Sequence, residues 1–335
     1  MIANRRQLLK SGLALSAVGI AGCTGNSNEQ LTVRLATATE GAAGQVAGSA
    51  FASVVNNNSD DVTVQAVPTT GSEANVGLLE RREQDIALVN EYNIRQAVER
   101  VGPFENISFD LTQTFHLFST QWMFWAPEDR DISSIEDINS DTKVAISSEG
   151  AGLRPPMIRF LNHAVDDYDL ISLPHPQQLG AFQEGLIDVG IGPKIANDNW
   201  TSYVQEQISV LDLVPLEFDS NSLSKIDDDP LIQYVEIDPG DGWVGNPESA
   251  IAGNLNYDWV AHPDVSNEAV YAMMKAMYEN RVELEDAYSL LRYHGQQNGE
   301  FFVNVLNSVP FHQGAANFWK EVDLWRPEFN VYNSQ

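Results

Sequence analysis

Three short stretches rich in glycine and hydroxyl side chains follow predicted strands and could hold an anion. Two of them lead into predicted helices, whose first backbone N–H groups are free to donate and whose dipole favours negative charge. Ordinary helix capping uses the same residue types and is the alternative. Three loops in comparable positions across two halves of the chain favour a ligand site. The candidates are Thr37, Thr39, Glu40 and Gly41 in the first loop, Thr70, Gly71 and Ser72 in the second, and Ser147, Ser148 and Gly150 in the third.

Charged, amide and aromatic side chains near these loops extend the candidate site. Arg154 follows the third loop, and a guanidinium can grip a carboxylate with two parallel hydrogen bonds. A surface ion pair with one of the 47 acidic residues is its alternative role. Lys194, at a predicted strand end, is a second cation, and Asn75 and Asn90 are further candidates. Trp243 could cover the site or belong to a hydrophobic core.

The sequence contains no recognisable catalytic set. Its six histidines form no His-Glu-x-x-His zinc motif, and neither Gly-x-Ser-x-Gly nor a Walker loop occurs. The single cysteine, Cys23, excludes an intramolecular disulfide and a metal site built from cysteines. We therefore expect a protein that is not an enzyme and that uses neither a metal nor a cofactor.

Residues 1–22 have the pattern of an export signal. Arg5 and Arg6 precede an apolar run at 13–21 that is too short to cross a bilayer. The arginine pair is typical of the twin-arginine route, which exports folded proteins. Small residues before Cys23 are typical of lipoproteins, in which the thiol is lipidated; a lone buried thiol is the alternative. We expect residues 23–30 to form a flexible tether that anchors the protein to the outer face of the cell membrane.

The chain is strongly acidic, with 19 basic and 47 acidic residues and a formal net charge of −28. Removal of residues 1–22 would take away three basic residues and no acids, leaving a net charge of −31. Such an imbalance destabilises a compact state by self-repulsion. Only six basic residues are lysines, and this composition indicates adaptation to concentrated salt, where the Debye length falls to about 3 Å. Nucleic acid is excluded as a partner, because phosphates require a basic surface.

Short β-like runs alternate with helical segments. Strands are predicted at 31–37, 61–68 and 85–91, with helices between them, and Ser72 is the predicted N-cap of the second helix. This order predicts a parallel sheet with helices on its faces. Residues 114–128 are predicted to leave this lobe as one or two strands.

A second α/β unit is predicted after this crossing. Its strands lie at 142–146, 169–174 and 186–192, and a helix starts near Pro155 or Pro156. The segment "GLLERREQDIALV" has a loose counterpart in "GAFQEGLIDVGIG", which indicates one structural unit used in each lobe. We predict a first lobe at 31–122 to which residues 250–335 return, and a second lobe at 123–249. Ligands of open α/β sheets bind beyond the carboxyl ends of the strands, so the two lobes would share a cleft.

The order of segments resembles the substrate-binding proteins of tripartite ATP-independent (TRAP) transporters, in the TAXI branch. The resemblance extends over nearly the whole chain after residue 30. Four segments carry it: "TTGSEANVGLLERREQDIALVNEYNIRQAV" (69–98), "SIEDINSDTKVAISSEGAG" (134–152), "VSNEAVYAMMKAMYEN" (265–280) and "VPFHQGAANFWKE" (309–321). The Gly-Ser-x-x-Asn stretch and the Pro-x-His-x-Gly-Ala segment are the most specific. The glycine loops at 44–48 and 150–154 depart from the family pattern.

The resemblance implies a type II periplasmic-binding-protein fold, a two-lobed α/β clamshell. Such a receptor would bind a small organic acid, such as glutamate, 2-oxoglutarate or a related dicarboxylate, and deliver it to a TRAP membrane permease. Ser72, Asn75, Ser148 and Arg154, with loop amides, are predicted to hold the acid. A sensor lipoprotein of the same fold is an alternative, and an extracellular α/β enzyme is a weaker one.

Overall fold

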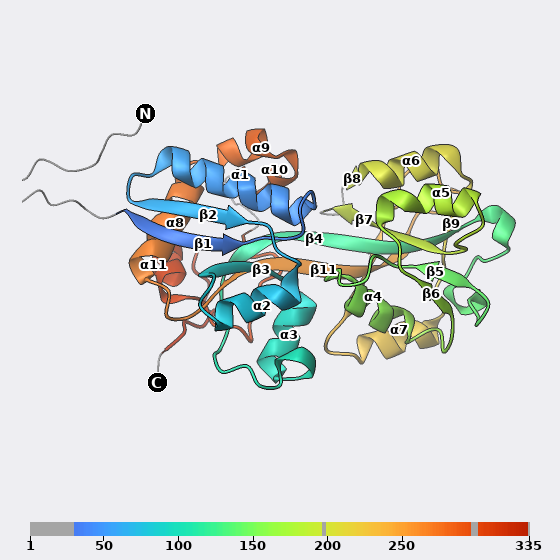
Figure 1. The fold of residues 1–335 in the computed structure, drawn as a ribbon, viewed down its shortest axis with the longest axis horizontal. Helices are drawn as coiled ribbons and strands as arrows, with labels where there is room; N and C mark the ends of the chain where they lie inside the picture. The colour runs from blue at the N-terminus through green and yellow to red at the C-terminus, as the bar shows by residue number, and fades with distance from the viewer. Residues whose placement is uncertain (1–29, 196–198, 296–300, 334–335) are drawn as a thin grey trace, which may run out of the picture.

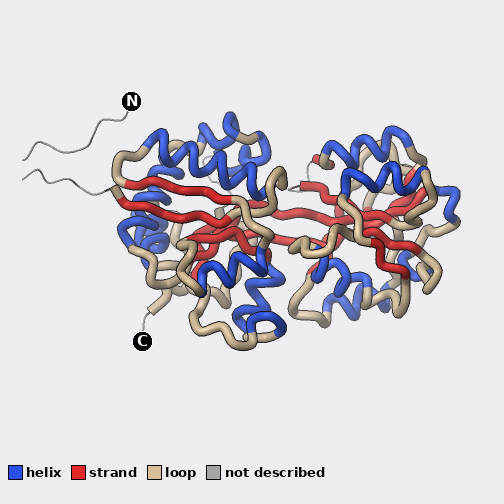
Figure 2. Tube along the Cα trace, viewed as in Figure 1, coloured by secondary structure: helices blue, strands red, loops and turns tan. Residues whose placement is uncertain are grey.

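The computed structural model describes residues 30–195, 199–295 and 301–333 and shows two lobes joined by a pair of long strands (Figure 1). One lobe holds the N-terminal strands and helices together with the C-terminal helices, and the other holds the middle of the chain. In both lobes helices cover the strands (Figure 2). Within the described ranges, every helix is too short or too polar to cross a bilayer. The predicted export signal and Cys23 lie outside the described residues.

The elements divide between the two lobes as follows. The first lobe contains β1 (Leu31–Ala36), α1 (Ala43–Asn58), β2 (Val62–Val67), α2 (Ser72–Glu80), β3 (Ile86–Asn90), α3 (Glu91–Glu99), α8 (Asn267–Glu279), α9 (Val282–Ala287), α10 (Arg292–Gly295) and α11 (Gln313–Glu321). The second contains β5 (Lys143–Ala145), α4 (Arg154–Leu161), β6 (Asp169–Ile171), α5 (Gln178–Gln183), β7 (Gly190–Ile195), β8 (Asn199–Trp200), α6 (Ser202–Val210), β9 (Leu213–Pro215), α7 (Ser220–Asp227) and β10 (Gln233–Ile237). The strands β4 (Thr112–Pro127) and β11 (Ala250–Ala261) run through both.

One sheet continues from lobe to lobe through β4 and β11. Its order in the described residues is β2-β1-β3-β11-β4-β7-β8, with β10 beside β11 and β9 beside β4. The strands β1, β2 and β3 are parallel, whereas β11 is antiparallel to both β3 and β4. This two-lobed α/β arrangement is the type II periplasmic-binding-protein fold expected from the sequence. The expected lobe limits fall inside β4 and at the start of β11.

The repeated segment predicted from the sequence forms the same structure in each lobe. In the first lobe, the backbone N–H of Asp85 donates to the carbonyl of Arg34, and the Asp85 carboxylate accepts from the N–H of Arg34 at 2.8 Å. In the second lobe, Asp188 makes the same pair of bonds with Lys143, at 2.8 Å and 3.0 Å. Each acid therefore fixes the start of one strand against the neighbouring parallel strand.

One prediction about an element needs correction. The N-cap of α2 is Gly71 rather than Ser72; Gly71 has φ 121° and ψ −169°, which glycine adopts far more easily than other residues. The run predicted as one or two strands at 114–128 is the single strand β4. The elements between residues 199 and 237 were not predicted.

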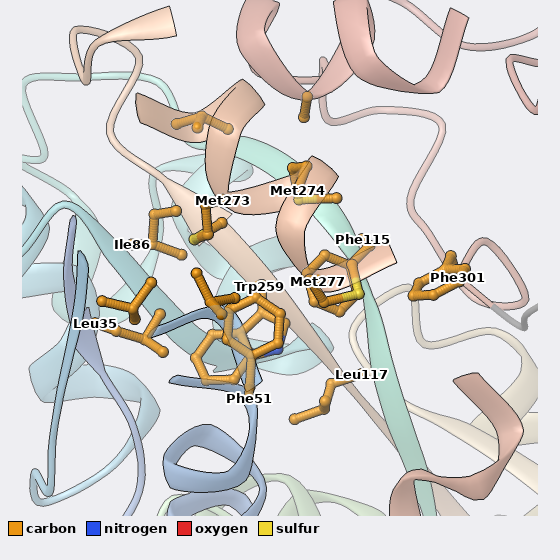
Figure 3. Packing of buried hydrophobic residues seen from close by; sticks show 14 of the residues in the cluster. Leu35, Phe51, Ile86, Phe115, Leu117, Trp259, Met273, Met274, Met277 and Phe301 are labelled. Atoms are coloured by element: carbon orange, nitrogen blue, oxygen red, sulfur yellow. The ribbon is translucent and has the colours of Figure 1, made fainter. Parts of the chain in front are cut away.

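The core of the first lobe is built where α8 packs on the sheet. Met273, Met274 and Met277 extend from this helix toward aromatic rings of the sheet and of α1 (Figure 3). Phe51 stacks on Trp259 with ring centroids 6.0 Å apart and lies 5.7 Å from Phe115. This cluster fixes the end of β11 that returns to the first lobe.

Gly314 near the start of α11 gives a test of the packing between the C-terminal helices. A Cβ atom on Gly314 would lie 2.3 Å from the carbonyl oxygen of Asn267 at the start of α8. We expect Gly314→Ala to lower the free energy of unfolding by about 1–3 kcal/mol, because backbone must shift to accept the methyl group.

The matched control is Gly180→Ala in α5, where nothing lies within 4 Å of the added atom. This substitution should leave stability unchanged or raise it by about 0.5–1 kcal/mol. Chemical denaturation of both variants measures the difference, and equal stability of the two would contradict the packing argument.

Candidate functional site: a pocket between the lobes

A pocket of about 690 Å³ lies between the start of α2 in the first lobe and the loop before α4 in the second. In Figure 1, α2 and α3 face α4 across the gap between the lobes. The wall of the pocket contains five of the predicted residues, Thr70, Gly71, Ser72, Gly150 and Arg154. It also contains residues that were not predicted, among them Glu73, Arg81, Asn93, Gly152 and Pro155.

The first turn of α2 supplies backbone donors to this pocket. Asn75 has the first backbone N–H of α2 that donates to a backbone acceptor, the carbonyl of Gly71. Within the part of the chain that the structure describes, no side chain caps this helix, so the amides of residues 72–74 are left for another acceptor. Because these residues line the pocket, the N-terminal end of α2 presents unpaired N–H groups and a favourable dipole to an anion.

The first turn of α4 is equipped differently. Its N-cap is Leu153, the amide of Arg154 donates to Ala151, and Pro155 and Pro156 have no N–H to offer. Backbone amides of this helix therefore cannot bind an anion as those of α2 can. A guanidinium takes their place, since the side chain of Arg154 lines the same pocket.

The side chain of Arg154 is half-buried and donates from Nη1 to the carbonyl of Ser147. Within the described residues, no carboxylate lies within ion-pair distance of it, although this chain contains 47 acidic residues. By contrast, the pocket residue Arg81 pairs with Glu83 at 2.7 Å. Arg154 is thus a cation in the pocket wall that is available to a carboxylate ligand.

Asn90 connects the two walls of the pocket. Its side-chain oxygen accepts from the N–H of Asn93 at 2.9 Å and so caps α3. Its backbone N–H donates to the hydroxyl of Ser72 at 3.0 Å, and its Nδ2 donates to the carbonyl of Gly152 at 3.1 Å. The last bond crosses between the lobes, so Asn90 holds the loop of the second lobe against the start of α2.

Several predicted residues lie away from this pocket. Thr37 is buried and donates from its hydroxyl to the carbonyl of Val67, whereas Thr39, Glu40 and Gly41 are exposed in the loop before α1. Ser147 is buried and Ser148 is partly exposed, and neither of them lines the pocket. Lys194 is buried and donates to the carbonyl of Asp238 at 2.5 Å. Trp243 is buried against Trp125 and Trp200, which favours its alternative role in the core of the second lobe.

Asn93 is a pocket residue that the sequence did not indicate. It is 3% exposed, its Nδ2 donates to Gln96 at 3.3 Å, and its Oδ1 has no partner among the described residues. The one available signal was its position three residues after Asn90, where the capping bond forms.

A Ser–His–Asp arrangement also occurs where β4 pairs with β11. Ser119 Oγ lies 3.2 Å from His116 Nε2, and His116 Nδ1 lies 3.0 Å from Asp258 Oδ1, with burial raising the pKa of Asp258. However, Ser119 donates its proton to the Oδ1 atom of Asn256 at 2.7 Å. The Nδ2 of Asn256 donates to Glu91, which fixes the orientation of the Asn256 amide. The proton of Ser119 therefore points to Asn256, and His116 does not take it up as the base of a serine nucleophile would. Within the described residues, no cluster of three or more potential ligands could hold a metal ion.

The model of the NMT1-like family matches residues 35–322, which is most of the chain. The chain belongs to the NMT1-like family. Among the curated proteins no match is found. The TAXI branch suggested by the sequence is a finer assignment than this family match provides.

Solved structures with similar folds accompany this NMT1-like match. The periplasmic aliphatic sulphonate binding protein SsuA of Escherichia coli is 12% identical, with 90% of this chain and 96% of that chain covered and a TM-score of 0.45. The protein XAC2383 of Xanthomonas citri, bound to ATP, is 10% identical, with 78% and 88% covered and a TM-score of 0.48. At these identities the similarity concerns the fold alone.

The contacts of Asn75 give this residue a structural role that substitution can test. It is fully buried, and its Nδ2 donates to the carbonyls of Thr37 and Leu88, both at 2.7 Å. We expect Asn75→Ala to lower the free energy of unfolding by about 2–4 kcal/mol, because two buried acceptors lose their donor.

Denaturant titration measures this change, with Asn57→Ala at an exposed position of α1 as the control. An Asn75→Ala protein of unchanged stability would show that the amide does not hold β1 and β3 together.

Proposed function

We propose that this protein is an extracytoplasmic solute receptor that binds a small organic acid between its two lobes. The observation that carries the proposal is Arg154, which lies in the pocket wall without a carboxylate partner in the described residues. The free amides of α2 line the same pocket from the other lobe. An acid held between them would contact both lobes at once and would favour their closed arrangement.

The net charge of the chain determines how an acid would be recognised. A protein with a net charge of −28 repels anions at long range in dilute solution. In concentrated salt this repulsion acts over only about 3 Å, so diffusion of the acid to the pocket is not opposed. Recognition then rests on hydrogen bonds inside the pocket, where exclusion of water strengthens them.

We further propose that the receptor is a lipoprotein that delivers its ligand to a TRAP membrane permease. Arg5, Arg6 and the small residues before Cys23 support export and lipidation, and the segments at 69–98 and 309–321 support the TAXI branch. The match to the NMT1-like family agrees with this proposal at a coarser level. The first lobe is proposed to span 31–122 and 250–335, and the second 123–249.

Substitution of Arg154 tests the proposal directly. A thermal-shift panel of small mono- and dicarboxylates in concentrated salt should first reveal an acid that raises the melting temperature. Arg154→Gln should then weaken its affinity by about 10-fold to 100-fold, because a charge-assisted hydrogen bond contributes about 1.5–3 kcal/mol. Arg154→Lys should retain part of the affinity, since it keeps the charge but loses the paired donors.

The control for the removed charge is Lys275→Gln, on α8 and outside the lining of the pocket. Isothermal titration calorimetry of the three variants measures the changes. Equal affinity of Arg154→Gln and the unaltered protein would contradict the proposed role of Arg154.

The salt dependence of stability tests the proposed adaptation to concentrated salt. The melting temperature should rise between about 0.1 M and about 3 M sodium chloride, because screening weakens the repulsion among the acidic residues. Differential scanning calorimetry measures it, with sucrose as an additive that stabilises without screening charge. The adaptation is refuted if sucrose stabilises the protein and salt does not.

A further inference from the structure

A second hollow of about 670 Å³ borders the pocket along α4. Pro155, Ile158, Arg159 and His163 line it from the second lobe, and Tyr92 lines it from α3 of the first. These positions along α4 lie three, four or eight residues apart, so they share one face of the helix and the turn after it. The two hollows have Arg154 and Pro155 in common, and they therefore meet at the start of α4.

Two basic side chains are held at the far end of this hollow. Asp229 accepts from Arg159 Nε at 2.5 Å and from His163 Nε2 at 2.8 Å. Burial alone would raise the pKa of Asp229, but the hydrogen bonds from Arg159, the backbone of Leu231 and His163 lower it, so the group is a carboxylate. One buried carboxylate thus positions a guanidinium and an imidazole against the hollow.

Arg159 keeps donors that Asp229 does not use. Its side chain is 43% exposed, whereas that of Asp229 is 2% exposed. Among the described residues, the hydrogen bond of Arg159 to Asp229 is made by Nε and not by the terminal amino groups, and the Tyr92 hydroxyl is a further hydrogen-bond partner of the guanidinium. Asp229 therefore fixes the direction of the guanidinium without occupying its terminal donors.

The surface between the two arginines is apolar. Pro155, Ile158 and the ring of Tyr92 line the hollow between Arg154 and Arg159. The arginines are five positions apart in the helix, which corresponds to about 7.5 Å along the axis of α4. The wall therefore presents a cation, an apolar stretch and a second cation in that order.

We propose that this hollow is a second acid-binding subsite, and that the solute is an elongated organic acid with an acidic group at each end of an apolar spine. One acidic group binds Arg154 and the amides of α2, and the other binds Arg159. The proposal rests on the solute-binding function proposed above and specifies its class of ligand. An acid of this length would contact α2, Tyr92 and both arginines, and would link the lobes along the whole of the combined pocket.

The test compares two series of probes in concentrated salt by isothermal titration calorimetry. One series contains unbranched α,ω-dicarboxylates of increasing length, and the other contains the monocarboxylates of equal length. The longer dicarboxylates should bind at least about tenfold more tightly than their monocarboxylate counterparts, which is the effect of one added charge-assisted contact.

Two variants locate the second contact. Removal of Arg159 alone would leave Asp229 buried without its main partner and could unfold the protein, so the double variant Arg159→Gln/Asp229→Asn is used. It should bring the affinity of dicarboxylates to within about twofold of that of monocarboxylates, whose own binding should not change. Asn162→Asp, at an exposed position in the lining, should weaken dicarboxylates more than monocarboxylates, and Asn221→Asp on α7 is its control.

The outcomes separate the two proposals. If monocarboxylates bind through Arg154 and dicarboxylates gain nothing, the second subsite is wrong and the receptor function stands. If inorganic phosphate depends on Arg159 but the dicarboxylates do not, the hollow is an inorganic anion site and the proposed ligand class is wrong. If neither series binds, the receptor function fails and the subsite fails with it.

Discussion

The ladder between β4 and β11 is the interaction on which the rest of the structure depends. The two strands pair antiparallel from Gly253 and Trp122 at one end to Ala261 and Thr112 at the other, with register shifts after Tyr257 and Trp259. At one end β11 pairs with β3, and at the other β4 pairs with β7 and β9. Each lobe is thus built on an extension of the same ladder. The position of α2 relative to α4, and with it the shape of the pocket, follows from how this ladder twists.

Charge is distributed within this frame in an uneven way. Carboxylates are abundant, and most described arginines are committed to one: Arg34 to Asp85, Arg95 to Glu91 and Arg159 to Asp229. The two walls of the pocket then provide positive potential by different means. The start of α2 uses backbone amides, whereas α4 has two prolines in its first turn and uses the side chain of Arg154. This combination gives an anion directional donors from one lobe and a full charge from the other.

Local signals predicted most of the fold and part of the site. Alternation and turn residues located β1, β2 and β3 of the first lobe and β5, β6 and β7 of the second. The recurring acid that proved to be Asp85 and Asp188 indicated the repeated unit. Loop composition located Gly71, Ser72 and Gly150 at the pocket. Thr39 and Gly41 belong to a loop of the same composition but do not line the pocket. The position of a loop in the cleft depends on how the lobes are arranged relative to each other and not on its own residues. Asn75 shows a related limit, since a buried amide that bonds two strand ends has the same sequence signature as one that binds a ligand.

The place of β11 in the sheet constrains the order in which the chain can fold. Asn90 of β3 pairs with Tyr257 of β11, so the sheet of the first lobe is closed by a strand synthesised long after its other strands. Most elements of the second lobe lie between them in sequence and can assemble earlier, whereas the first lobe must wait for residues 250–261 and for the helices that cover them. A chain with this topology gains its native form only when nearly all of it has left the ribosome. An export route for proteins already folded, as proposed from Arg5 and Arg6, would spare such a chain from completing its long-range pairing outside the cell.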